Sequence, residues 1–197
     1  MIDTIKQDLQ KIYRKAGKTH RLKHVYGVVE TALYYAKQFN VDERKITIAS
    51  LLHDCTKYLS KDEHIDYIKK GFDNSEWIIE SFNENLYHAY SAAAYATITY
   101  GITDQDILMA IMHHTVGRPN MSDIEAILFV SDYIEPSREY ESCKQVREIA
   151  KDNFTKAIYT IMDNSIKLFQ DGTQNIPELA YLARDYYKEE LKQNEEN

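Results

Sequence analysis

The sequence predicts an all-α protein, a single compact bundle of eight or more helices. Glycine and proline contribute only 6 and 3 of the 197 residues, too few for an all-β chain with many tight turns. Apolar residues recur at helical spacing along almost the whole chain. The length and a hydrophobic content of 44% fit one globular domain over 1–197, with an N-terminal helix in 1–18 and a frayed tail at 193–197.

The first elements are two amphipathic helices and a shorter third one. Apolar stripes run over 2–12 and 22–39, and each defines one buried helix face. Asp42 is a suitable N-cap for the third helix, which continues to His53. The polar sequence that follows His53 predicts the end of that helix.

Capping-box patterns predict three further helix starts, and two more helices lie between them. The three pairs are Ser60 with Glu63, Thr103 with Asp106, and Ser122 with Glu125. The intervening helices are a short one over 74–82 and an alanine-rich one over 86–100, which Gly101 stops.

The last third of the chain is also helical. Apolar residues continue at helical spacing from about 139 to 169, and Gly172 ends this pattern. Pro177 suits the first turn of a final helix that ends near Lys192. We find no internal repeat, strand alternation or flexible linker in the sequence.

Charge and cysteine content exclude several classes of function. With 24 Lys and Arg against 31 Asp and Glu, the formal net charge is −7, which disfavours a nucleic-acid partner. An anionic substrate would therefore need a local basic pocket. Cys55 and Cys143 are too few for a disulfide framework, so we expect a reduced, cytoplasmic protein. The longest apolar run, 46–52, is too short to cross a membrane, and the charged N-terminus is not a signal peptide.

Five polar residues occupy positions on otherwise apolar helix faces. They are His24, His53, His88, His114 and Asp132. A buried polar group without a partner costs about 1–3 kcal/mol, and more if it is charged. Any one of them alone is typical of a core histidine or capping aspartate that the backbone satisfies. All five together favour a metal, because bundle cores hold metals with convergent side chains from different helices.

One metal position can be assembled from four of the candidate residues. Neighbouring residues on a regular helix point about 100° apart, so His53 and Asp54 can converge only at a helix end. The sequence after Asp54 predicts such an end. A metal there could take His24, His53, Asp54 and Asp132. Mixed imidazole and carboxylate donors suit iron, manganese or zinc.

The remaining polar residues allow two interpretations. His88 and His114 could hold a second metal that shares Asp54, or they could contact substrate oxygens, which the pattern favours slightly. Four basic residues flank the same elements and predict an anion pocket: Arg21, Lys57, Arg118 and Arg138. We expect surface or capping roles for His20, His64 and His113, and a core or homodimer contact for Trp77.

The ordered set His24, His53-Asp54, His88, His114 and Asp132 resembles the HD-domain metal-dependent phosphohydrolases, an all-helical superfamily. Longer segments are similar to the YqeK branch, which hydrolyses symmetrical dinucleoside tetraphosphates. These segments are RLKH at 21–24, LLHDCTK at 51–57, AIMHHTVG at 110–117, FVSDYIEPSR at 129–138 and NIPELAYLARD at 175–185. The resemblance covers about residues 20–185.

The resemblance implies hydrolysis of diadenosine tetraphosphate to two ADP at an iron-containing centre of one or two ions. It implies metal binding by His24, His53, Asp54 and Asp132, and catalytic roles for Asp54, Lys57, His88 and His114. The implied substrate contacts are Arg21, His24, Asp54, Lys57, His88, His114, Asp132, Arg138, Asn175 and Pro177. Two residues depart from the family pattern: Ile176 replaces a usual His, and Asp185 replaces a frequent Asn.

Two other functions remain open at this point. The same scaffold could perform a different phosphoester reaction, as a nucleoside monophosphate phosphatase or a cyclic-nucleotide phosphodiesterase. It could also be a non-catalytic nucleotide or metal sensor. Product analysis distinguishes the enzymes from one another, and turnover distinguishes an enzyme from a sensor.

Overall fold

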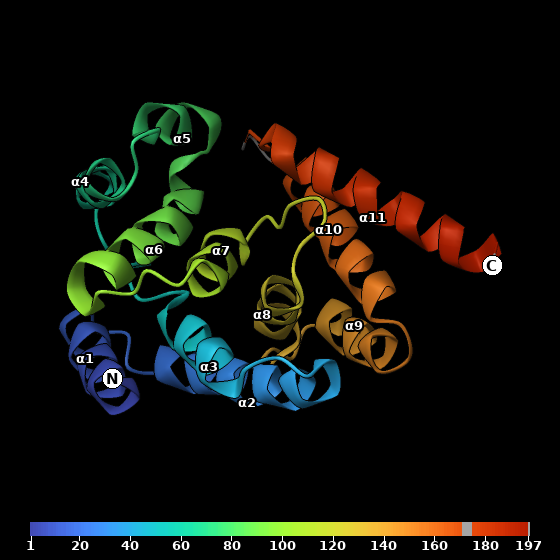
Figure 1. The fold of residues 1–197 in the computed structure, drawn as a ribbon, viewed down its shortest axis with the longest axis horizontal. Coiled ribbons are helices and arrows are strands. Elements are labelled where there is room, and N and C mark those ends of the chain that lie inside the picture. Colours follow the sequence, from blue (N-terminus) through green and yellow to red (C-terminus); the bar gives the residue numbers. More distant parts are fainter. Residues whose placement is uncertain (171–174, 197) are drawn as a thin grey trace.

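The computed structural model describes residues 1–170 and 175–196 and confirms an all-α bundle in that part of the chain. The described residues form eleven α-helices and a 3-10 turn at Glu84–Leu86, and Figure 1 shows how the helices are arranged. The helices are α1 Ile2–Lys15, α2 Arg21–Phe39, α3 Glu43–Leu52, α4 Lys61–Gly71, α5 Ser75–Ser81, α6 Tyr87–Tyr100, α7 Gln105–His113, α8 Asp123–Ile134, α9 Glu141–Asp152, α10 Phe154–Gln170 and α11 Glu178–Glu196.

Helix α8 forms the centre of the bundle. It contacts α2, α3, α7, α9 and α10, and Figure 1 shows it nearly end-on among them. Every residue from 124 to 131 is buried, as expected of a helix that neighbours cover on all sides. The main hydrophobic core surrounds this helix, and residues of α4, α5 and α6 form a second cluster with Phe82. The core thus fixes α2, α3, α7 and α8 relative to one another.

Most helix ends follow the expected local chemistry. The Asp42 carboxylate accepts hydrogen bonds from the backbone N–H groups of Arg44 and Lys45, which starts α3. Ser60 and Glu63 form a capping box at α4, and Ser122 and Glu125 form another at α8. Gly101 ends α6 with a φ of 66°, in the left-handed region that glycine adopts without strain.

Three boundaries differ from the prediction. Thr103 does not cap α7, because the Asp104 carboxylate accepts the hydrogen bond from the Asp106 backbone N–H. The stretch predicted over 139–169 is divided into α9 and α10, because Asn153 adopts an extended conformation between them. Helix α11 continues to Glu196, past the predicted end near Lys192. The predicted stop at Gly172 lies outside the described residues.

None of the described helices is long and apolar enough to cross a membrane.

Candidate metal centre and substrate cavity

The turn that follows α3 brings His53 and Asp54 to the same side of the chain, as the sequence predicts. His53 is the C-cap of α3, and its Nδ1 lies 2.6 Å from the carbonyl oxygen of Ser50. The Tyr13 hydroxyl donates a hydrogen bond of 3.1 Å to the carbonyl oxygen of Asp54. Helix α1 therefore fixes the backbone at which both side chains converge.

Four histidines share one hydrogen-bonding pattern. In each of them Nδ1 has an acceptor, whereas Nε2 is buried and has no hydrogen-bond partner within the described part of the chain. The Nδ1 distances are 3.0 Å from His24 to Glu135 Oε1, 2.6 Å from His53 to the Ser50 carbonyl, 2.8 Å from His88 to the Asn85 carbonyl and 2.7 Å from His114 to the Ile111 carbonyl. Metal-binding histidines are held in this way, so the orphaned Nε2 atoms fit a metal site.

Asp54 lies between these histidines with its two oxygens facing different pairs. Its Oδ2 is 3.6 Å from His53 Nε2 and 3.9 Å from His24 Nε2. Its Oδ1 is 3.4 Å from His88 Nε2 and 3.6 Å from His114 Nε2. One buried carboxylate therefore faces the Nε2 atoms of all four histidines.

Asp132 completes one side of this arrangement. Its side chain is only 16% exposed, and its Oδ1 lies 3.1 Å from His24 Nε2 and 3.9 Å from His53 Nε2. Two sets of three residues could each hold a metal, because the donor atoms within each set all lie within 4.8 Å of one another. His53 belongs to both sets. The sets are His24, His53 and Asp132, and His53, Asp54 and His114. These imidazole nitrogen and carboxylate oxygen donors suit a divalent metal of intermediate hardness.

The electrostatic surroundings keep these groups in the protonation states that a metal requires. Burial lowers the pKa of His53 to about 4 and that of His88 to about 3, so both imidazoles are neutral at pH 7. Burial alone would raise the pKa of Asp54, but His53 and Lys57 hold it well below its usual range. The pKa of Asp132 is likewise held low, against the effect of burial, by Arg138 and His24.

Three predicted basic residues surround the two carboxylates. An Arg21 Nη atom lies 2.6 Å from Asp54 Oδ2, and Lys57 Nζ lies 2.9 Å from Asp54 Oδ1. An Arg138 Nη atom lies 2.7 Å from Asp132 Oδ1. These cations stand beside the donor atoms, where phosphate oxygens would be neutralised.

Arg118, the fourth predicted cation of the anion pocket, lies elsewhere. Its guanidinium pairs with Glu125 at 2.6 Å, and the same carboxylate accepts a hydrogen bond from the Ser122 backbone N–H. Glu125 is buried, and such a carboxylate requires an opposite charge. Arg118 therefore stabilises the start of α8, and its prediction as an anion-binding residue was wrong.

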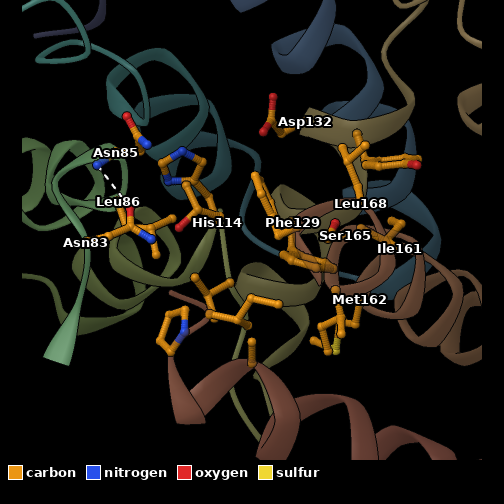
Figure 2. Close-up of a pocket in the computed structure, with 18 of the residues that line it drawn as sticks. Asn83, Asn85, Leu86, His114, Phe129, Asp132, Ile161, Met162, Ser165 and Leu168 are labelled. Carbon is orange, nitrogen blue, oxygen red and sulfur yellow. Dashed lines mark hydrogen bonds between the residues drawn. The ribbon is translucent and has the colours of Figure 1, made fainter. Parts of the chain in front are cut away.

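A cavity of about 500 Å³ opens beside the donor atoms (Figure 2). Lys57, His88, His114, Asp132 and Arg138 line its polar part. The other walls are largely apolar and come from α8 and α10, including Phe129, Tyr133, Ile161, Met162, Ile166, Leu168 and Phe169. Figure 2 shows Asn83 and Asn85 on one side of His114, and Phe129 and Leu168 on the other.

The segment before α11 closes one side of the cavity. Asn175, Ile176 and Pro177 line it, and the Asn83 side chain donates a hydrogen bond of 3.0 Å to the Asn175 carbonyl. Ile176 thus gives this wall an apolar side chain. Asp185 is 60% exposed, is paired with Arg184, and is not among the residues that line the cavity.

Sequence reasoning missed two residues that support His24. Glu135 accepts from His24 at its Oε1 and from the Ser137 backbone N–H at its Oε2. A Cβ atom at Gly27 would lie 2.5 Å from Glu135 Oε2, so only glycine leaves room for this carboxylate. Both lie three residues after a candidate ligand, Glu135 after Asp132 and Gly27 after His24, which is the spacing that could have identified them.

The three histidines expected at the surface have different environments. His20 is exposed at the N-cap of α2, and His113 is partly buried beside Glu125. His64 is buried, with Nδ1 2.7 Å from Ser91 Oγ, so its predicted surface or capping role was wrong. Its helix, α4, packs against α6, and this contact covers the imidazole. Trp77 is 55% exposed and is not a core residue.

The fold and its histidine and aspartate donors define an HD-domain protein, and the HD domain family model matches residues 21–137. A protein of Halalkalibacterium halodurans named symmetrical bis(5′-nucleosyl)-tetraphosphatase is 37% identical over 157 residues, which cover 80% of this chain and 83% of that protein. The chain therefore belongs to the HD-domain family and, within it, to the family of proteins that carry this name. The Bacillus subtilis protein of the same name is 32% identical over 80% of this chain and 83% of its own length.

A solved structure supports the same assignment. It is described as a predicted HD superfamily hydrolase involved in NAD metabolism from Clostridium acetobutylicum. The two chains superpose with a TM-score of 0.84 and 34% sequence identity, over 93% of this chain and 97% of the other.

Proposed function

We infer that this chain is a metal-dependent hydrolase that cleaves diadenosine tetraphosphate symmetrically into two ADP. The observation that carries this inference is the convergence of four buried Nε2 atoms on Asp54, beside a cavity with cationic and apolar walls. The relatives named for symmetrical tetraphosphatase activity identify the substrate class.

We propose that His24, His53, Asp54 and Asp132 hold one metal ion. The donor distances around His24 and Asp132 support this position. We further propose a second ion at His88 and His114, with Asp54 as the bridge, because its Oδ1 faces both Nε2 atoms. Iron is the proposed metal, and manganese or zinc would suit the same mixture of donors.

A metal at these donors would lower the pKa of a bound water and supply hydroxide at neutral pH. Lys57 and Arg138 would then bind the phosphate oxygens on which charge increases during the reaction. Arg21 would keep Asp54 ionised and correctly oriented, because its guanidinium is only 2.6 Å from the Asp54 carboxylate. The acceptors at Nδ1 fix each imidazole ring, so that its Nε2 points into the site before the substrate binds.

The cavity supports a nucleotide as the substrate. Its apolar walls from α8 and α10 match the faces of a nucleobase, while Lys57 and Arg138 match the phosphate chain. Holding the base in the apolar part fixes which phosphorus lies at the metal. Symmetrical cleavage then requires attack on one of the two inner phosphorus atoms, so that the bond to the oxygen between them breaks and ADP leaves.

The experiment is incubation of the freshly purified protein with diadenosine tetraphosphate, a mononucleotide and a cyclic nucleotide. Chromatography of the products and quantification of bound metal are done on the same sample. We expect ADP as the product of the dinucleotide. Free phosphate from the mononucleotide, or ring opening of the cyclic nucleotide, as the faster reaction would favour the rival enzymes. A metal-loaded protein that binds but never cleaves would be a sensor.

We also propose a cytoplasmic location and a homodimer. Cys55 and Cys143 are both buried and free, which supports a reducing compartment. The exposed Trp77 on α5 supports a contact with a second copy. Light scattering of the parent and of Trp77→Ala tests the dimer.

A further inference from the structure

A second, smaller cavity adjoins the substrate cavity. Its volume is about 340 Å³, and it shares Lys57, Asn85 and His88 with the larger one. The two cavities therefore meet at a histidine of the proposed metal site. In Figure 2, Asn85 lies on the side of His114 that is remote from the apolar wall.

The walls of the second cavity are more polar than those of the larger one. Besides the shared residues they comprise Lys61, His64 and Glu84, and Leu59 is the one aliphatic side chain among them. A nucleobase would find little apolar surface here. Lys57 and Lys61 each have one carboxylate partner, Asp54 and Glu84, and their ammonium groups are the groups here that could bind a chain of phosphates.

One wall of this cavity is rigid and joined to the metal site. His64 is buried, and its Nδ1 lies 2.7 Å from Ser91 Oγ, which lies 2.8 Å from Thr56 Oγ1. The Thr56 hydroxyl donates a hydrogen bond of 3.0 Å to the carbonyl oxygen of His88. The cavity thus belongs to the same buried network that positions the turn after α3.

The substrate itself requires a second binding region. A dinucleoside tetraphosphate has two identical halves, and the attacked phosphorus lies near its middle. If one nucleoside occupies the larger cavity, the other half must leave the metal on a different side. The second cavity begins at His88 and Lys57, where that half of the phosphate chain would emerge.

We propose that this second cavity is a phosphate subsite for the distal half of the substrate. Lys61 binds the phosphate, and Glu84 is the carboxylate that pairs with Lys61 when no substrate is bound. Lys61 Nζ lies 3.3 Å from Glu84 Oε2, and the two side chains are 57% and 58% exposed. Such an exposed pair is weak, so a phosphate can displace Glu84. The subsite binds phosphate rather than the distal base, which extends toward solvent. The proposal rests on the proposed function.

The test compares Lys61→Ala with a matched control, Lys70→Ala. Lys70 is also an exposed lysine of α4 in an exposed ion pair, 2.6 Å from Asp66, but it does not line either cavity. Lys61→Ala should lower kcat/KM for diadenosine tetraphosphate about fivefold to tenfold, as expected for one partly exposed charge-assisted hydrogen bond. The control should match the parent. Inhibition by ADP, which occupies the larger cavity, should be unchanged in both variants.

Glu84→Gln provides a test of opposite sign. It removes the competing carboxylate, so kcat/KM should rise about twofold, and both effects should shrink at high ionic strength. Equal kcat/KM for Lys61→Ala and its control would overturn the subsite, as would a matching loss of ADP inhibition. A parent protein that does not cleave the dinucleotide would instead refute the proposed function, so the two failures are distinguishable.

Discussion

The change Glu135→Gln tests whether the contact between His24 and Glu135 orients the His24 imidazole for metal binding. Glu135 is buried, and its Oε1 accepts from His24 Nδ1 at 3.0 Å while its Oε2 accepts from the Ser137 backbone N–H at 2.7 Å. Glutamine is nearly the same size but has only one acceptor oxygen. Either His24 or Ser137 would then face an amide NH₂ group.

The magnitude follows from these contacts. A buried donor left without an acceptor costs about 1–3 kcal/mol. If the loss falls on His24, the imidazole loses the partner that fixes its tautomer and orientation. Loss of such a supporting contact typically weakens metal affinity or activity by about 10- to 100-fold. We therefore expect metal affinity to fall within that range.

The assay is competition between the protein and a metal chelator of known affinity, with thermal denaturation of the metal-free variant alongside. Glu139→Gln is the matched control, because Glu139 is exposed and lies in the same segment after α8. Metal affinity of Glu135→Gln within about twofold of the control would refute the argument, since the His24 to Glu135 contact would then contribute nothing to metal binding.

Three further predictions follow from the site. Asp132→Ala should remove bound metal and activity together, measured by elemental analysis and turnover, and full occupancy with unchanged turnover would show that Asp132 is not a ligand. Lys57→Ala and Arg138→Ala should melt within a few degrees of the parent yet lose about 10- to 100-fold in kcat/KM, because they act on phosphate; unfolding or normal hydrolysis would contradict this. In the metal-free protein, His53 has a pKa of about 4, against an unfolded value of about 6.5. Its unfolded form therefore binds more protons between these values, so the free energy of unfolding should fall as pH decreases from about 6.5 to 4, by on the order of 3 kcal/mol from this group. Chemical denaturation across that range measures the decrease, and a flat profile would show that His53 is not buried in its neutral form.

Helix ends could be predicted from the sequence where a capping residue sets them. Asp42, Ser60 and Gly101 mark helix ends through their own side chains or conformations, and those ends are where the sequence places them. The division at Asn153 is different. Apolar spacing continues through it and hides the break, although Asn153 Oδ1 accepts a hydrogen bond from the Lys156 backbone N–H and so caps α10.

The candidate site shows the same distinction. His24, His53, His88 and His114 could be predicted because polar residues on apolar faces require a reason to be buried. Arg118 could not be distinguished from Arg138 in this way, since both follow a candidate ligand. What separates them is Glu125, a buried carboxylate that lies across the turn from Arg118 and pairs with it. The supporting contacts of Glu135 and Gly27 likewise depend on how α2 and the end of α8 approach each other.

Hydrolysis of diadenosine tetraphosphate in oxygen-18 water tests the central claim most directly. If hydroxide attacks the second phosphorus from one nucleoside, each turnover places one label in one of the two ADP molecules, on its terminal phosphate. Mass spectrometry of the separated products measures this. ATP and AMP in equal amounts would mean asymmetric attack, and would contradict the assigned reaction even if the metal site proved correct.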